Sequence, residues 1–226
     1  MNILIVEDHP MIIAFYRAAL MEYFGSNIKI STACNCADAY HEITSAKADY
    51  SIAIIDYSLP IYAEENIFSG IDLISLIRTR NNMCKIILIT GNDQRLFLYD
   101  IFKQARPEAM ATKNNITAEN FIGIINIVLE GNHYTCPTIK QSINDIWLNR
   151  VLADEHNRDI IMNLSRGYKV NELHTVIPLA EITIKKRLSL IKKAIHIDSK
   201  ENLLTEIKRI GLLIIIYTIS IVYVNV

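Results

Sequence analysis

Two hydrophobic patterns alternate along the first part of the chain: short runs of consecutive apolar residues, and longer segments with an apolar residue at every third or fourth position. The short runs are typical of strands buried on both faces, and the longer segments of amphipathic helices. Strands are expected at Asn2–Val6, Ile28–Thr32, Ile52–Asp56, Lys85–Ile89 and Ala109–Thr112. Helices are expected at Met11–Phe24, Ala37–Ser45, Ile71–Arg80, Leu96–Ala105 and Phe121–Leu129. This alternation predicts an α/β fold, a doubly wound five-stranded parallel sheet with helices on both faces.

The pattern changes after a linker over residues 132–153, in which Ile139–Leu152 is expected to be helical. From Asp154 only helical spacing remains, and helices are expected at Asn157–Ser165, Val170–Val176, Ala180–Ile195 and Ser199–Arg209. A short helix, a turn and a long helix with a lysine-rich outer face is the plan of a helix-turn-helix domain. On spacing alone, a small helical bundle whose lysines simply face water is the stronger interpretation, so the second domain is at this point only a small all-α domain.

Length and charge add a weak hint about function. A chain of 226 residues is long enough for two small domains. Residues 151–226 carry 11 Lys and Arg against 8 Asp and Glu, a net charge of +3, which leaves −4 for residues 1–150 of the total of −1. An acidic first part and a mildly basic second part fit a regulatory module joined to one that binds nucleic acid.

The cysteines and the N-terminus indicate a cytoplasmic protein. Cys34-Asn-Cys36 does not have the spacing of a zinc site, and we expect all four cysteines to be reduced. The N-terminal strand carries no basic region and no cleavage site, so no secretory signal is expected.

Reactive side chains stand at the ends of four of the five expected strands. Glu7 and Asp8 follow the first strand, Asp56 ends the third, Thr90 follows the fourth and Lys113 follows the fifth. Because parallel strands end at one edge of the sheet, these side chains can converge there. Crowded carboxylates with room for water suit Mg²⁺. One carboxylate could then attack a phosphoryl group whose oxygens are stabilised by Mg²⁺, a hydroxyl and an ammonium.

These residues resemble the response-regulator receiver family over residues 1 to about 131. The resemblance is carried by Val6-Glu7-Asp8-His9-Pro10, Ile54-Ile55-Asp56-Tyr57-Ser58-Leu59-Pro60, Ile89-Thr90-Gly91 and Thr112-Lys113. It implies a flavodoxin-like receiver domain in which Asp56 accepts a phosphoryl group from a sensor histidine kinase. Thr90 and Lys113 are then expected to contact the phosphoryl oxygens.

The same resemblance implies a set of Mg²⁺ ligands. Asp8, Asp56 and the backbone carbonyl of Ser58 are expected to bind the ion directly, and Glu7 mostly through water. Met110 stands where the family usually has an aromatic residue that reports the switched state. Methionine is flexible enough to repack at such a position, and the phosphoryl chemistry does not need an aromatic residue there.

The C-terminal helices resemble the LuxR/NarL-type DNA-binding domain over about residues 154–212. The matching segments are Arg158-Asp159-Ile160-Ile161, Ser165-Arg166-Gly167, Glu181-Ile182-Thr183-Ile184-Lys185 and Ile191-Lys192-Lys193. The resemblance implies binding to double-stranded DNA, and dimer formation through the last helix when Asp56 is phosphorylated. The residues expected to contact DNA are Thr183, Lys185, Lys186, Ser189, Lys192 and Lys193, of which Lys186, Lys192 and Lys193 would mainly touch phosphates.

The last residues, Ile210–Val226, are apolar and carry no charged side chain. Three interpretations fit them: a packing segment between domains or subunits, which we favour, a short membrane anchor, or a sticky extension. The expected organisation is therefore a receiver domain at 1–131, a linker helix at 132–153, a helix-turn-helix domain at 154–212 and a tail at 213–226.

The resulting hypothesis is a two-component transcriptional regulator rather than an enzyme. Two alternatives belong to other classes. A phosphatase of the haloacid-dehalogenase kind would need a second Asp two residues after the nucleophile, where this chain has Ser58. A receiver that signals through protein contacts would use the C-terminal helices as an adaptor that does not bind DNA.

Overall fold

The computed structural model describes residues 1–197, 202–209 and 212, so the apolar tail expected at 213–226 lies outside the described residues. The chain forms two compact units. Unit 1 comprises Met1–Asp93 and Asp100–Lys140, and unit 2 comprises Gln94–Tyr99 together with Gln141–Val226.

A parallel sheet forms the centre of unit 1. Its strands are β1 (Asn2–Val6), β2 (Lys29–Ala33), β3 (Ile52–Asp56), β4 (Lys85–Thr90), β5 (Ala109–Thr112) and β6 (Tyr134–Thr135). They lie in the order β2-β1-β3-β4-β5-β6, and every neighbouring pair is parallel. The doubly wound parallel sheet is confirmed, but the predicted strand count of five is wrong. The sixth strand is a two-residue extension beside β5, too short to show any hydrophobic alternation.

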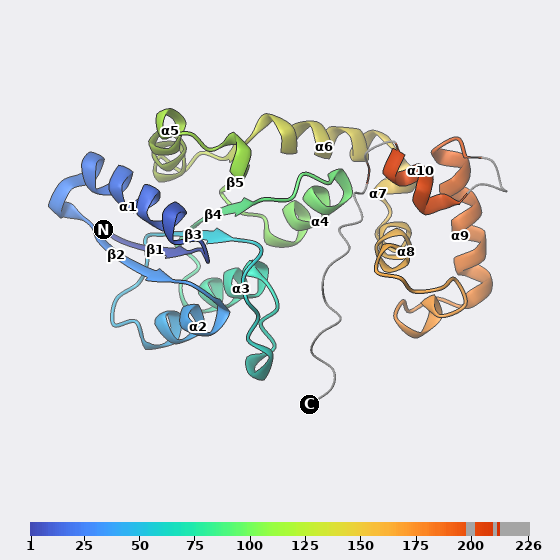
Figure 1. Ribbon diagram of the computed structural model, residues 1–226, viewed down its shortest axis with the longest axis horizontal. Helices are drawn as coiled ribbons and strands as arrows, with labels where there is room; N and C mark the ends of the chain where they lie inside the picture. The colour runs from blue at the N-terminus through green and yellow to red at the C-terminus, as the bar shows by residue number, and fades with distance from the viewer. Residues whose placement is uncertain (198–201, 210–211, 213–226) are drawn as a thin grey trace. The chain divides into compact units, whose positions relative to one another are not determined.

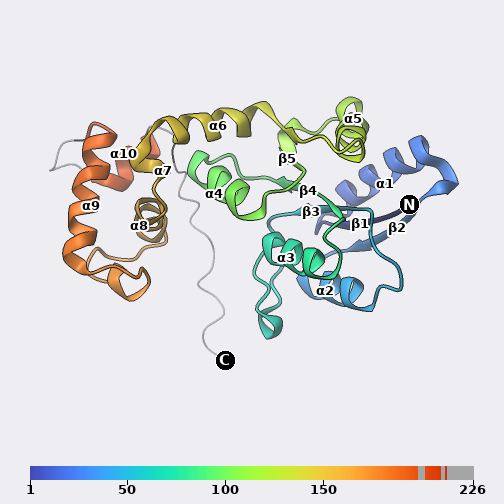
Figure 2. The same ribbon diagram turned by 180° about the vertical axis from the view of Figure 1, so that it is seen from behind.

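Helices cover both faces of this sheet. The helices of this part of the chain are α1 (Pro10–Phe24), α2 (Cys36–Ser45), α3 (Gly70–Arg80), α4 (Arg95–Ala105) and α5 (Ala118–Leu129). Figures 1 and 2 show α1 and α5 on one face, and α2 and α3 on the other. On the first face the rings of Tyr16 and Phe121 stack at 4.7 Å between centroids. Because both faces are covered, all five residues of β3 are buried, as their continuous apolar pattern requires.

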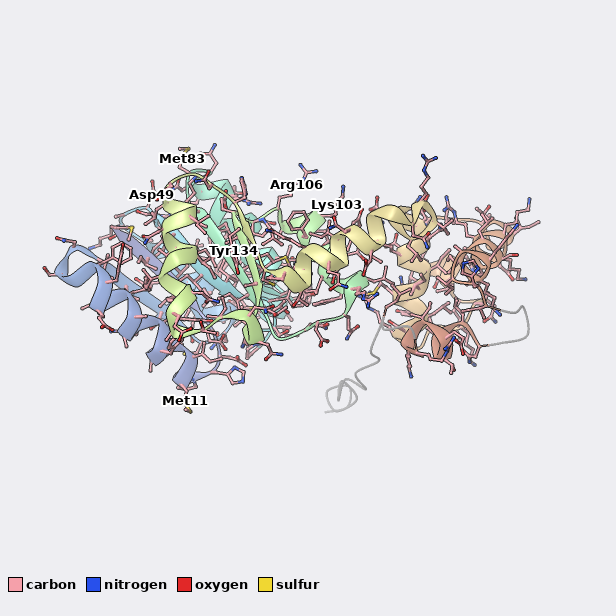
Figure 3. The ribbon with its side chains drawn as sticks, turned by 90° about the horizontal axis from the view of Figure 1, so that it is seen from above. Met11, Asp49, Met83, Lys103, Arg106 and Tyr134 are labelled. Carbon is pink, nitrogen blue, oxygen red and sulfur yellow. The ribbon has the colours of Figure 1, made fainter. Side chains whose placement is uncertain are left out.

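The strands of unit 1 all end at one edge of the sheet. In Figure 3, Asp49 and Met83, which precede β3 and β4, lie at one edge. Met11, which follows β1, lies at the opposite edge. The acidic residues that follow β1 and end β3 therefore share the second edge.

A glycine lets α3 approach this edge. Gly70 is the first residue of α3, and Ser69 before it forms a capping box with Asp72. A methyl group on Gly70 would overlap the backbone oxygen of Asp56 and lie 2.9 Å from Cγ2 of Ile55. The close contact of α3 with the end of β3 thus depends on the missing side chain.

The described part of unit 2 is helical. The remaining helices are α6 (Pro137–Leu148), whose first residues belong to unit 1, and α7 (Arg150–Ala153), α8 (Glu155–Ser165), α9 (Glu181–Ala194) and α10 (Leu203–Arg209), with a 3₁₀ helix at Leu173–Thr175. The prediction of one helix over Ile139–Leu152 is wrong, because Asn149 interrupts it and its side chain caps α7. The helix predicted over Val170–Val176 is only the three-residue 3₁₀ turn.

The core of unit 2 includes the beginning of α4. Leu96 and Tyr99 are buried in the same cluster as Ile160, Ile184 and Ile191. The guanidinium carbon of Arg158 lies 4.9 Å from the centre of the Tyr99 ring, a cation–π contact. Within the described residues, none of the helices is both apolar enough and long enough to span a bilayer.

Candidate functional site

The structure brings together the acidic and basic residues predicted from the strand ends. Glu7 and Asp8 follow β1, Asp56 is the last residue of β3, and Lys113 follows β5. Lys113 Nζ donates hydrogen bonds to Glu7 Oε1 at 2.9 Å and to Asp56 Oδ2 at 2.8 Å. A single ammonium therefore bridges carboxylates that lie 106 and 57 positions away in the sequence.

The two bridged carboxylates are buried. Glu7 is 1% exposed and Asp56 is 3% exposed, whereas 22% of the Lys113 side chain reaches solvent. Burial raises the pKa of Asp56, and the hydrogen bond from Lys113 offsets only part of that effect. Burial lowers the pKa of Lys113, but its bonds to Asp56 and Glu7 outweigh this, and the pKa lies above its usual value. Keeping a carboxylate charged in this pocket therefore costs free energy, and the hydrogen bonds from Lys113 reduce that cost.

His9 also belongs to the cluster, a role that the sequence pattern did not predict. Its Nδ1 lies 2.7 Å from Glu7 Oε1 and 2.6 Å from Asp8 Oδ1. The hydrogen bond to Glu7 raises the pKa of His9 above its ordinary value. One feature of the sequence could have identified His9. It directly follows Glu7 and Asp8, so its side chain must lie near theirs.

The cluster has the composition of a site for a hard divalent cation. Ligand atoms of Glu7, Asp8, His9 and Asp56 all lie within 4.8 Å of one another. Asp8 Oδ1 is shielded from solvent and, apart from its close contact with His9 Nδ1, has no hydrogen-bond partner among the described residues. A shielded carboxylate oxygen of this kind, beside two other carboxylates, fits Mg²⁺, which prefers oxygen ligands. The donors expected from the sequence thus suit the ion.

The other predicted members of the site lie on the same strand ends. Thr90 ends β4, is fully buried, and its hydroxyl accepts a hydrogen bond from the Asn92 amide at 3.1 Å. The Ser58 amide donates to Asp56 Oδ1 at 3.3 Å, while the role expected for the Ser58 carbonyl stays a prediction. Met110 is fully buried in β5, paired in register with Leu88.

A second group of predicted residues lies on α9 in unit 2. Lys185, Lys186, Ser189 and Lys193 are exposed, and Thr183 and Lys192 are half-buried. The side chain of Lys185 pairs with Glu181 one turn earlier, at 2.6 Å. The helix therefore presents a polar, mainly basic face, and its opposite face enters the core through Ile184 and Ile191.

Polar contacts fix α9 against the start of α8. Arg187 Nη1 donates to Asp154 Oδ1 at 2.7 Å and to Asn157 Oδ1 at 2.8 Å. Asp154 also caps α8 by accepting a hydrogen bond from the Asn157 amide. The Arg187 side chain thus bonds to residues of the same unit, whereas Lys185 and Lys186 beside it in the sequence are exposed.

Residues 3–110 match the family model of the response regulator receiver domain. No curated protein matches the chain.

The chain is similar in fold to solved RcsB structures. One, described as two RcsB dimers bound to two parallel DNAs, is 17% identical with a TM-score of 0.63, and the match covers 95% of this chain and 99% of that one. Another is RcsB of Salmonella enterica serovar Typhimurium bound to a promoter in the presence of the phosphomimetic BeF3-, at 16% identity and a TM-score of 0.63, covering 94% and 98%. At these identities the likeness concerns the fold. The part of the chain that is similar to the response regulator receiver domain, residues 3–110, contains the acidic cluster, and Lys113 follows it closely in the sequence.

Proposed function

We propose that this protein is a two-component response regulator in which Mg²⁺-dependent phosphorylation of Asp56 by a sensor histidine kinase controls DNA binding and transcription. The observation that carries the proposal is the convergence of Glu7, Asp8, Asp56 and Lys113 at one edge of a receiver-type sheet. We further propose that it acts in the cytoplasm, as a regulator rather than as an enzyme with a separate substrate.

Asp56 is suited to be the acceptor. Its carboxylate lies at the end of β3, with one oxygen bonded to Lys113 and the other to the Ser58 amide. An Asp56 oxygen would form a bond to phosphorus while the bond from phosphorus to the donor's histidine nitrogen breaks, and that nitrogen keeps the electron pair. Lys113 would stabilise the charge on the transferring oxygens, with the Thr90 hydroxyl close by on β4. Mg²⁺ held by Asp8, Asp56 and the Ser58 carbonyl, with Glu7 acting through water, would neutralise further negative charge.

Phosphorylation would change the pocket because Lys113 is shared. A phosphoryl group adds negative charge and strong acceptor oxygens. In the unmodified protein, Lys113 Nζ contacts Glu7 and Asp56 at nearly equal distances. The new oxygens would compete with Glu7 for this ammonium, and they would accept a hydrogen bond from the Thr90 hydroxyl. We infer that the ends of β4 and β5 change as a result, and that this change controls unit 2.

The exposed face of α9 supports DNA binding by unit 2. A helix that follows a turn and carries Lys185, Lys186 and Lys193 on its exposed face suits the major groove and its phosphates. The solved structures with the same fold include RcsB bound to DNA. We propose that Thr183, Lys185, Lys186, Ser189, Lys192 and Lys193 form the contact surface, and that two phosphorylated copies bind together as a dimer.

Binding of genomic fragments to the full chain, with and without phosphorylation, tests this part of the proposal. Lys185→Ala and Lys186→Ala should each weaken binding, and Lys186→Ala, which removes an expected phosphate contact, should also reduce the slope of log affinity against log salt by about 1. Lys169→Ala, which removes an exposed lysine of the same unit outside α9, is the matched control. If no fragment is retained in either state, the helical unit is better explained as an adaptor for protein contacts.

A further inference from the structure

An exposed isoleucine interrupts the polar face of α9. Ile182 is the second residue of the helix and 67% of its surface is exposed, whereas Ile184 and Ile191 are fully buried. Single exposed apolar residues are common on protein surfaces. What distinguishes Ile182 is its place on this helix, which the proposed function assigns to DNA.

Helical geometry places Ile182 in the middle of the exposed face. At about 100° per residue, Ser189 and Lys193 point within about 20° of the direction of Ile182. Lys186 and Lys185 lie one turn away, on either side of that direction. The buried residues Ile184 and Ile191 lie about 160° to 180° away, on the opposite side. Ile182, Ser189 and Lys193 thus form a stripe along the exposed face of α9, and Ile182 is its apolar member at the N-terminal end.

The first turn of a recognition helix is the part that reaches base edges in the major groove. In that groove the C5 methyl group of thymine is the apolar group that distinguishes a T·A pair, and apolar side chains contact this methyl group. Lys185 forms an ion pair with Glu181, which is next to Ile182 in the sequence, so these two charged groups neutralise each other. The group of the first turn that is left exposed without a polar function is the branched side chain of Ile182.

We propose that Ile182 is a specificity-determining residue that packs against the methyl group of one thymine in each DNA half-site. The inference rests on the proposed DNA-binding function and adds the base that the helix selects. The contact buries apolar surface and carries no charge. Its contribution to affinity is therefore independent of salt, in contrast to the lysine contacts with phosphate.

The test begins with duplexes that the full-length phosphorylated protein selects from a random-sequence library. In the selected duplex, each thymine is replaced in turn by deoxyuridine, which removes only the methyl group. At one thymine per half-site, uridine should weaken binding of the natural protein by about fourfold, the effect of losing one buried methyl-sized group. That ratio should be the same at low and high salt, while the overall affinity falls.

Variants at position 182 identify the side chain responsible. Ile182→Ala should bind the thymine and uridine duplexes equally at that one position, and Ile182→Val, which keeps branched methyl groups, should restore the difference. Leu190→Ala is the matched control, because Leu190 is 54% exposed on the same helix but lies near the edge of the stripe. It should keep the fourfold ratio.

Two outcomes separate failure of this inference from failure of the proposed function. If a sequence is selected but Ile182→Ala keeps the full thymine preference at every position, the assignment of Ile182 is overturned and DNA binding stands. If the phosphorylated chain selects no sequence at all, the DNA-binding function itself is contradicted, and the role of Ile182 with it.

Discussion

Removal of the Lys113 ammonium is the sharpest test of the electrostatics of the pocket. Lys113→Met keeps a side chain of similar length but removes the charge that bridges Glu7 and Asp56. Both carboxylates are almost fully buried, so solvent cannot replace the lost partner. The variant leaves two negative charges close together and shielded from solvent.

The expected loss of stability follows from this burial. Breaking a buried ion pair by removing one partner typically costs about 3–5 kcal/mol. Because 22% of the Lys113 side chain is exposed, we expect the lower end, about 3 kcal/mol near pH 7. Lys47→Met, which removes a lysine that is exposed in the same unit, should change stability by less than about 0.5 kcal/mol.

The loss should depend on pH in a defined direction. The pKa of Asp56 is already raised by burial, so its protonated form favours folding, and that contribution fades as pH rises through the raised pKa. Without Lys113 the pKa rises further, which enlarges the penalty near neutral pH. Below the ordinary carboxylate pKa of about 4, the group is protonated in both folded and unfolded chains, and the difference between variant and natural protein should shrink.

Hydrogen exchange of the β1 and β3 amides during a urea titration measures the stability of unit 1 directly, because these strands lie within it. The titration is run at about pH 7 and about pH 4 on both lysine variants and the natural protein. A loss for Lys113→Met that is equal at both pH values, or no larger than that of Lys47→Met, would refute the reasoning.

Two further substitutions test local features. Gly70→Ala should push the end of β3 away from α3, destabilise unit 1 by about 1–3 kcal/mol and slow phosphorylation of Asp56. Urea unfolding measures the first effect, and the rate of phosphoryl uptake measures the second. An unchanged rate would contradict the role given to the missing side chain of Gly70. Asp154→Ala removes both the cap of α8 at Asn157 and one of the two partners of Arg187, and should destabilise unit 2 by about 1–2 kcal/mol in thermal unfolding. Asp159→Ala, in the interior of α8, is the control for the cap, and an equal effect of the two substitutions would argue against it.

The sheet and the site were predictable because their signals are strong and local. Continuous apolar runs such as Ile52–Ile55 can be satisfied only where helices cover both faces. Once the strands are parallel, their ends share one edge, and the contact of Lys113 with Asp56 follows from topology rather than from neighbouring sequence.

The features that the sequence did not predict depend on weaker or non-local signals. The two residues of β6 have no period to detect, and only pairing with β5 defines them as a strand. The break between α6 and α7 depends on one hydrogen-bonded side chain, that of Asn149. Periodicity predicts a helix over Leu96–Ala105, but not that Leu96 and Tyr99 at its beginning pack in the core of the helical unit.

The central claim is that Asp56 accepts a phosphoryl group in the pocket formed with Asp8 and Lys113. Its most direct test is to incubate the full chain with Mg²⁺ and acetyl phosphate, then locate the phosphoryl group by mass spectrometry of peptides. The account predicts one phosphoryl group on Asp56, which does not form when Mg²⁺ is chelated beforehand and is absent from Asp56→Asn. Unchanged labelling of Asp56→Asn, or no labelling of the natural protein, would contradict it.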